Sequence, residues 1–298
     1  MRRLPGGGSP ARLRGMTPAD DDTLIAVTFG ALHRWHGDMR EAFAQVDQPD
    51  ALHHLASALG HLVLIESLMI SLEHKDRPPQ LLYQRGIPEQ YRDSIIDRYF
   101  SGGYLLDPFC LAVEQGLAQG FYHLEEIAPD HFFDSEYYKT YYLKAGCSED
   151  SFYIVDTGQG TQISVSLFQG FGGEILSAGQ LNLLRAVEPL VREFLREFSQ
   201  RGLQANAVLQ GDGQTQNRDD LKHRVQNAFD HFGCDCLTDR EREVAHMVLR
   251  GHSVKSTATL MSISPETVRM HRKNLYLKLE VSSQSELFAL FIEWLRQH

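Results

Sequence analysis

The sequence has few cysteines and no long apolar run. Its four cysteines, Cys110, Cys147, Cys234 and Cys236, are too few and too unevenly placed for a secreted disulfide framework in a chain of 298 residues. No stretch approaches the ~18 consecutive apolar residues that a membrane-spanning helix requires. We therefore expect a cytoplasmic protein without a membrane segment.

Motifs for nucleotide binding, metal binding and catalysis are also missing. The phosphate-binding pattern GxxxxGK[ST] is absent, and the glycines of residues 158–160 are typical of a hairpin turn. The histidines within residues 53–61 lack a carboxylate or a cysteine at ligand spacing, and Cys234 and Cys236 lack a second pair. No pair of a nucleophile and a base has a sequence spacing that indicates a catalytic site. We expect no cofactor, no metal and no enzymatic activity.

Negative charge exceeds positive charge, and the excess is unevenly spread. The formal net charge is −10, from 39 Asp and Glu against 29 Lys and Arg. Residues 234–298 hold nine basic and eight acidic residues, which leaves 20 basic and 31 acidic residues in the rest of the chain. Such an acidic body repels a polyanion, so a polyanion could bind only at a local basic face.

Length and composition predict two domains joined by a linker. A leader at residues 1–20 is basic but has no apolar run after its arginines, which is typical of disorder and not of a signal peptide. Apolar periodicity stops at residues 200–220, where Gly, Gln, Asn and Asp dominate. We predict an N-terminal domain at residues 21–199, a linker at 200–235 and a second domain at 236–298.

The N-terminal domain alternates between helical and strand periodicity. The predicted helices are 50–62, 87–100, 107–116, 134–146 and 177–198, and the predicted strands are 67–74, 80–86 and the two halves of 151–168. In the last hairpin, Ile163, Val165 and Leu167 should face one way and the intervening polar residues the other. Helices mixed with an antiparallel sheet predict an α+β domain arranged as an α-β-α sandwich.

The helix predicted at 177–198 carries apolar residues at alternating spacings of three and four. They are Leu184, Val187, Val191, Phe194 and Phe198. Pro189 interrupts the pattern and should kink the helix. The spacing fits either a core helix lying on the sheet or a coiled-coil-like dimer seam.

The C-terminal domain reads as four capped helices and is expected to be all-α. Thr238, Ser253, Ser264 and Ser283 stand where each helix would begin, and Gly251 would end the first. A short second helix, a three-residue turn and a capped third helix form the helix-turn-helix plan, in which the third helix enters the DNA major groove.

The third helix, SPETVRMHRKNLYLKL at 264–279, gathers cations on one element. At 100° per residue, the inward stripe consists of Val268, His271, Leu275 and Leu279. Arg269, Met270 and Lys273 fall on the opposite face, while Arg272 and Lys278 flank the stripe, within reach of DNA phosphates.

The C-terminal 65 residues closely resemble the DNA-binding domain of LuxR-type (GerE-like) transcriptional regulators. The matching residues are Leu237, Thr238, Arg240, Glu241, Glu243, Val244, Gly251, Lys255, Ser264, Thr267, Val268, His271, Asn274, Lys278, Leu279 and Val281. One departure lies in the second helix, where Ser256 and Thr257 replace the Glu-Ile of the family.

This resemblance implies a set of DNA contacts. Base-reading residues would be Arg269, Met270 and Lys273, and backbone contacts would come from Lys255, Thr267, Arg272 and Asn274. It also implies a homodimer on an inverted-repeat operator, with RNA polymerase as a partner if the protein is an activator.

The fourth helix has more apolar surface than one small domain needs to cover it. One stripe consists of Leu287, Leu290, Phe291 and Trp294, and a second of Phe288, Ile292 and Leu295. We assign the first stripe to dimerisation.

The N-terminal domain lacks the acid pair and lysine of a phosphorylated receiver and the ATP-binding motif of other LuxR architectures. Residues 91–108 faintly resemble the acyl-homoserine-lactone-binding domain, which implies a ligand site at Tyr91, Tyr99, Asp107 and Tyr122. Ile95 and Tyr122 stand where that family carries tryptophans. Two alternatives remain open: the domain binds another ligand in a PAS- or GAF-like pocket, or the tyrosines simply pack in the core.

These observations predict a dimeric, sequence-specific DNA-binding transcriptional regulator controlled by a small-molecule ligand. The alternatives are an interaction module or anti-regulator that keeps the fold without binding DNA, and a divergent acyl-homoserine-lactone quorum-sensing receptor. The acidic N-terminal region supports the first alternative.

Overall fold

The structure is a computed structural model that describes residues 25–203 and 231–297, except 75–76, 101–102, 115, 159–160 and 173. The predicted leader and residues 204–230 of the predicted linker lie outside the described residues. Among the described helices, none is long and apolar enough to cross a membrane.

A five-stranded antiparallel sheet organises the N-terminal domain, with strand order β2-β1-β5-β4-β3. The strands are β1 (Ser67–His74), β2 (Arg77–Arg85), β3 (Gly120–His123), β4 (Glu149–Gly158) and β5 (Thr161–Gln169). The β4–β5 hairpin matches the strand pair predicted at 151–168, and β1 matches its predicted bounds.

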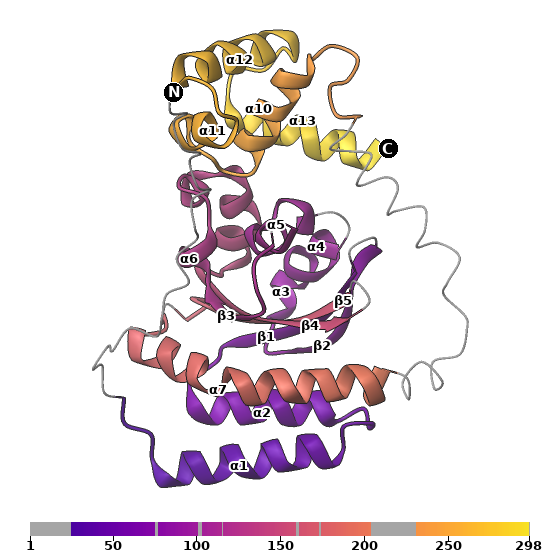
Figure 1. The fold of residues 1–298 in the computed structure, drawn as a ribbon, viewed down its shortest axis with the longest axis vertical. Helices are drawn as coiled ribbons and strands as arrows, with labels where there is room; N and C mark the ends of the chain where they lie inside the picture. The colour runs from indigo at the N-terminus through magenta and orange to yellow at the C-terminus, as the bar shows by residue number, and fades with distance from the viewer. Residues whose placement is uncertain are drawn as a thin grey trace, which may run out of the picture.

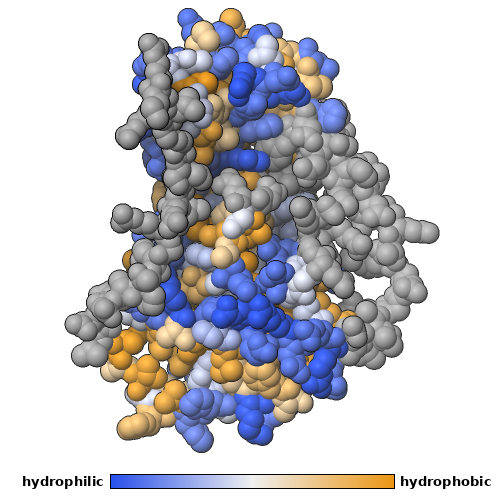
Figure 2. Space-filling model, in the orientation of Figure 1, coloured by the Kyte–Doolittle hydropathy of each residue, from blue (hydrophilic) through white to orange (hydrophobic). Residues whose placement is uncertain are grey.

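Three long helices cover one face of the sheet. Helices α2 (Ala51–Leu62) and α7 (Ala178–Glu197) lie beneath the strands, and α1 (Phe29–Ala44) packs on their outer side (Figure 1). Ile163, Val165 and Leu167 point into this layer and are fully buried. Figure 2 shows apolar side chains gathered at the lower left, over the start of α1, where Phe29 is 93% exposed.

Short helical pieces cover the opposite face. They are α3 (Glu89–Arg92), α4 (Arg98–Phe100), α5 (Pro108–Glu114) and α6 (Leu124–Ile127), with π-helical turns at Asp93–Asp97 and Tyr138–Tyr142 and 3₁₀ turns at Gly103–Leu106, Phe132–Asp134 and Leu143–Ala145. The predicted α+β sandwich is therefore confirmed (Figure 1). Because helices cover both faces, Ser164 and Ser166, predicted on the polar side of β5, are also buried.

Helix α7 is a core helix. Its Leu184, Val191 and Phe194 are fully buried in the same cluster as the inward residues of β5, Phe198 just beyond its end belongs to that cluster, and Val187 packs against it. The spacing of three and four therefore reflects packing against the sheet and α1, where Phe43 meets Phe194 edge-on at 5.5 Å between ring centroids. Pro189 lies inside the helix.

The C-terminal domain consists of α10 (Asp239–Leu249), α11 (Val254–Leu260), α12 (Pro265–Lys278) and α13 (Gln284–Gln297). The side chains of Thr238, Ser253 and Ser264 accept hydrogen bonds from the first turns of α10, α11 and α12, as predicted. Phe232, inside the predicted linker, packs edge-on against Phe291 at 5.2 Å, so packing on this domain begins before residue 236.

The two domains touch through the chain that follows α6. The carboxylate of Asp130 accepts hydrogen bonds from the backbone N–H and the hydroxyl of Ser253, the residue that caps α11. The His131 N–H donates to the Gly251 carbonyl at 3.1 Å. Gly251 has φ of 86°, and a Cβ there would lie 2.9 Å from the Cα of Phe132, so only glycine fits this contact.

Candidate functional site

Helix α12 lies on the far side of its domain from the sheet (Figure 1). Ser264 caps it by accepting the Thr267 N–H at 3.1 Å, and Pro265 occupies the first turn. Val268 and Leu275 are buried and fasten the helix to α10 and α11. The remaining face of α12 is therefore held rigidly outward.

The outward face carries the residues predicted to read bases. The Arg269 side chain is 62% exposed and makes a 3.0 Å ion pair with Glu266 one turn earlier. Met270 is 52% exposed, and Lys273 is also exposed. A surface ion pair of this kind is worth little, so Arg269 can leave Glu266 for an acceptor on DNA.

The residues predicted to contact the DNA backbone differ in how far they are engaged within the chain. Arg272 donates from Nε to the Tyr276 hydroxyl at 3.1 Å, and its guanidinium lies 5.3 Å from that ring centroid. Lys255 is exposed, whereas Thr267 and Asn274 are half-buried.

Lys278, which the helical geometry placed within reach of phosphates, serves the fold. Its Nζ donates to Oε2 of the buried Glu241 at 2.7 Å, and this hydrogen bond lowers the pKa of Glu241. The contact ties the end of α12 to the start of α10.

The assignment of one α13 stripe to dimerisation needs correction for two residues. Leu287 and Phe291 are fully buried inside this chain, so in this conformation they belong to the core of their own domain. Leu290 and Trp294 are half-buried. Phe291 packs against Phe232, which precedes α10, a contact that the helical wheel of α13 alone does not contain.

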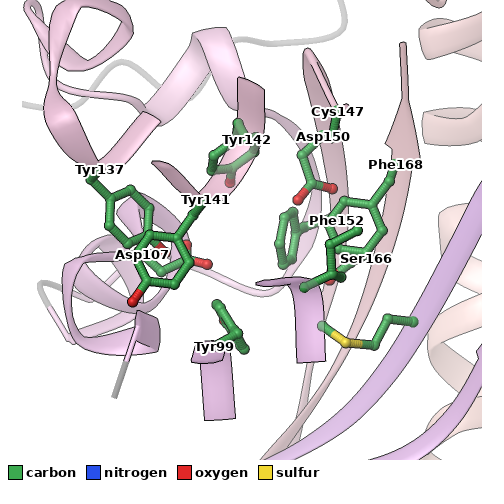
Figure 3. Close-up of a pocket in the computed structure, with 12 residues that line it drawn as sticks. Tyr99, Asp107, Tyr137, Tyr141, Tyr142, Cys147, Asp150, Phe152, Ser166 and Phe168 are labelled. Atoms are coloured by element: carbon green, nitrogen blue, oxygen red, sulfur yellow. The ribbon is translucent and has the colours of Figure 1, made fainter. Parts of the chain in front are cut away.

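A pocket lies between the sheet and the short helices of the N-terminal domain (Figure 3). Its cavity volume is about 30 Å³, within about 400 Å³ of empty space that also includes open solvent. Its lining consists of Met69, Ile95, Tyr99, Asp107, Tyr137, Tyr141, Tyr142, Cys147, Asp150, Phe152, Ser166 and Phe168. Both π-helical turns contribute to it, through Ile95 on one and Tyr141 and Tyr142 on the other.

Asp107 is one of two buried acids in this lining. It is 2% exposed, and its carboxylate accepts the Phe109 N–H at 2.7 Å, which caps α5. Burial raises the pKa of Asp107 to about 7, although hydrogen bonds from the Phe109 amide and the Tyr99 hydroxyl partly oppose the shift.

Asp150, at the start of β4, is the second buried acid. It is 1% exposed, and in Figure 3 its carboxyl points from the strand side toward the tyrosines. Burial, together with the Asp107 carboxyl, raises the pKa of Asp150 well above its ordinary value, and the backbone amides of Ser151 and Leu167 offset part of this effect.

The structure brings together only part of the predicted ligand site. Tyr99 and Asp107 line the pocket, as does Ile95. Tyr91 instead stacks on Phe171 at 5.9 Å, and the hydroxyl of Tyr122 on β3 donates to the carbonyl of Ala118, which precedes that strand. Neither belongs to the pocket lining.

The predicted ligand site did not include Asp150, Ser166, Tyr137, Tyr141 and Tyr142, all of which line the pocket. A polar residue on a strand normally indicates a solvent-facing position. The available signal was that Asp150 shares one face of β4 with Phe152 and Ile154, two and four residues further on, which places the acid on an apolar face. Within the described residues, no group of three or more His, Cys, Asp or Glu could hold a metal ion.

Comparison with known proteins identifies the C-terminal domain. Residues 235–291 match the family described as bacterial regulatory proteins, luxR family (GerE). The transcriptional regulatory protein UhpA of Salmonella typhimurium is 49% identical over 61 residues, which are 20% of this chain and 31% of that protein. The structure of the VqsR LBD domain from Pseudomonas aeruginosa is 24% identical with a TM-score of 0.49, and the match covers 56% of this chain and 96% of that one.

A longer match extends beyond the helix-turn-helix. The "Putative HTH-type transcriptional regulator in exeN 3'region" of Aeromonas salmonicida is 35% identical over 191 residues. The match covers 63% of this chain and 94% of that protein. Because residues 235–291 match the family and this relative is matched over nearly its whole length, the chain belongs to the LuxR family of helix-turn-helix transcriptional regulators.

Proposed function

We propose that this regulator binds an inverted-repeat DNA operator as a homodimer and responds to a small molecule in the pocket of its N-terminal domain. The observation that carries the DNA-binding part is the outward face of α12. Arg269, Met270 and Lys273 are exposed there on a helix whose other face is locked into the domain. Arg269 suits a bidentate contact to guanine, and Met270 suits a thymine methyl.

The experiment starts from DNA that the purified full-length protein enriches from a random pool. Binding to the enriched site and to an unrelated duplex is then followed by fluorescence anisotropy at several salt concentrations. Arg269→Ala should cost about 1–3 kcal/mol on the enriched site and relax the choice of one base. Arg272→Ala should weaken both duplexes similarly and reduce the salt slope by about one.

Arg201→Ala, on the exposed turn after α7, is the matched control and should leave both affinities unchanged. Equal effects of Arg269→Ala and Arg272→Ala on both duplexes would contradict the assignment of faces on α12. Failure of the wild-type protein to enrich any DNA would favour the alternative of an interaction module that keeps the fold without binding DNA.

The sensory part of the proposal is supported by the pocket between the sheet and the short helices. Concave sites lined by aromatic and apolar side chains with a few convergent polar groups are typical of small-molecule binding. In this pocket, apolar side chains of the sheet and aromatic side chains of the turns surround two carboxyls. A control ligand for this part is N-octanoyl-homoserine lactone, because the faint resemblance of residues 91–108 names that chemistry.

A further inference from the structure

The polar groups on the pocket face of the sheet are incompletely satisfied. Among the described residues, Oδ1 of Asp150 and the hydroxyls of Ser166 and Ser67 are buried without a hydrogen-bond partner. In the antiparallel register, Ser67 and Asp150 both lie opposite Phe168, and Ser166 lies between Met69 and Phe152 one row away. Asp150 and Ser166 both line the pocket, so their unpartnered oxygens are available to a ligand inside it.

The pocket has acids but no base. Its lining contains the carboxyls of Asp107 and Asp150 and no Lys, Arg or His. Asp107 is already engaged as the cap of α5, through the Phe109 N–H, whereas Asp150 keeps one oxygen unpaired. When the acids are ionised, a ligand that brings hydrogen-bond donors and positive charge therefore completes this site.

The remaining walls suit an organic cation. The rings of Tyr99, Tyr137, Tyr141 and Tyr142 border the pocket on the helical side, and Tyr137 and Tyr141 stack at 4.7 Å (Figure 3). Aromatic faces attract a desolvated cation. Opposite them, Phe152, Phe168 and Met69 form an apolar wall. An anionic ligand would meet two carboxyls and no counter-charge.

We propose that the ligand of this pocket is a small primary amine, bound as its ammonium with one N–H on Asp150, another on Ser166 and a short apolar body among the rings. The inference rests on the proposed sensory function and names its ligand class. It differs from a lactone site, because an ammonium donates three hydrogen bonds and carries a charge, whereas a lactone presents mainly acceptors.

Proton linkage gives the site a signature that a neutral ligand lacks. Asp107 titrates near pH 7, and the titratable groups that interact with it or with Asp150 are Tyr99, Glu73, Tyr137, Tyr142 and Cys147, in addition to each acid with the other. An ammonium binds the ionised carboxyls. Its affinity should therefore rise with pH as Asp107, with a pKa of about 7, and Asp150, whose pKa is also raised, lose their protons, and binding to the protonated site should release protons.

The test uses the full-length chain and three probes of nearly equal size. Butylammonium, 1-butanol and butyrate differ in charge and donors but share a short alkyl body. Isothermal titration at pH 8 should give a Kd for butylammonium at least about tenfold below that for 1-butanol, with no binding of butyrate. At pH 6, titrations in two buffers of different ionisation enthalpy should show release of about one proton. Equal affinities of butylammonium and 1-butanol would overturn the proposal.

Variants locate the binding. Asp150→Asn keeps the shape of the side chain and should abolish the preference for butylammonium. Asp156→Asn, at the exposed end of the same strand, is the matched control and should leave it unchanged. Ser166→Ala should weaken butylammonium several-fold, and it replaces Asp150→Asn if circular dichroism shows that the latter does not fold. Undiminished butylammonium binding in either pocket variant would contradict the assigned site.

A fourth titration, with N-octanoyl-homoserine lactone, separates the two proposals. Saturable binding of the lactone without binding of butylammonium would overturn the amine and keep the sensory function. Absence of binding by every probe to a folded protein would count against both.

Discussion

The two domains differ in where the polar residues assigned to function lie: on the surface in one domain and in the interior in the other. In the helix-turn-helix domain, the polar residues assigned to function stand outside on α11 and α12, and the buried Glu241 is hydrogen-bonded to Lys278. In the N-terminal domain, Asp107, Asp150 and Ser166 lie inside, against the sheet. An outward site can change without cost to the fold, whereas an inward site draws on the same interactions that stabilise the domain.

The largest expected effect concerns the interior of the helix-turn-helix domain. Phe291→Ala removes a fully buried ring that packs on Phe232 and should cost about 3–5 kcal/mol in the free energy of unfolding. Urea unfolding of the full-length chain, followed by circular dichroism, measures the change. Leu277→Ala, at a side chain that is 77% exposed, should stay within about 0.5 kcal/mol. Unchanged unfolding of Phe291→Ala with loss of the dimer would restore the dimerisation assignment of Phe291.

The second effect belongs to the interior acid Asp107. In the folded protein the Asp107 carboxyl keeps its proton up to about pH 7, whereas in the unfolded chain it ionises near its ordinary pKa of 3.8. The unfolded state therefore gains from ionisation between these values. The contribution of Asp107 to stability is complete below about pH 4, decreases as the pH rises to about 7, and is constant above that. At 1.36 kcal/mol per pKa unit, the decrease is up to about 4 kcal/mol.

Asp107→Asn, which can still cap α5, should remove this dependence. The free energy of unfolding of the variant should rise relative to the wild type between pH 4 and pH 7. The chain has two tryptophans, and in a Trp294→Phe background the fluorescence of the buried Trp35 reports on the N-terminal domain alone. The free energy of unfolding of Asp156→Asn should instead differ from that of the wild type by the same amount at every pH in this range. A constant difference between Asp107→Asn and the wild type across this range would show that Asp107 is ionised in the folded state.

The same contrast explains how much could be predicted from the sequence. Helices α10, α11 and α12 follow local rules, because Thr238, Ser253 and Ser264 fix their starts and an amphipathic wheel separates inside from outside. Their bounds and the outward face of α12 were therefore predictable. Strand β1 and the β4–β5 hairpin were equally clear because their alternation is regular.

The parts that could not be predicted depend on partners distant in sequence. Helix α1 and the four-residue strand β3 were missed; α1 buries Trp35, Met39 and Ala42, and β3 is held by pairing with β4. The helix predicted at 134–146 became π and 3₁₀ turns, with Gly146 at φ of 73° where a Cβ would lie 2.8 Å from the Tyr91 ring. Asp150 was missed although it shares a strand face with Phe152 and Ile154, because only the turns that cover this face make it an interior.

A smaller effect tests how local the helix-turn-helix is. Ser264→Ala removes the cap that accepts the Thr267 N–H and should cost about 1 kcal/mol. Ser264→Asn can accept the same hydrogen bond and should restore most of this loss. Trp294 fluorescence during urea unfolding in a Trp35→Phe background measures both variants. Loss of stability of the N-terminal domain in Ser264→Ala, followed by the fluorescence of Trp35 in a Trp294→Phe background, would show that the two domains unfold together.

The smallest expected effect lies where the two domains meet. Asp130 is exposed, so its hydrogen bonds to Ser253 should contribute about 1 kcal/mol or less. Ser253→Ala also removes the cap of α11, and therefore only a double-mutant cycle with Asp130→Ala isolates the contact between domains. A coupling energy of about 0.5–1 kcal/mol is expected from the urea midpoints of the four proteins. A coupling of zero would mean that Asp130 does not hold α11. A value in the expected range has a functional meaning: ligand binding can shift a contact this weak with a modest difference in affinity between docked and released domains, whereas a contact of several kcal/mol would require a difference of several powers of ten.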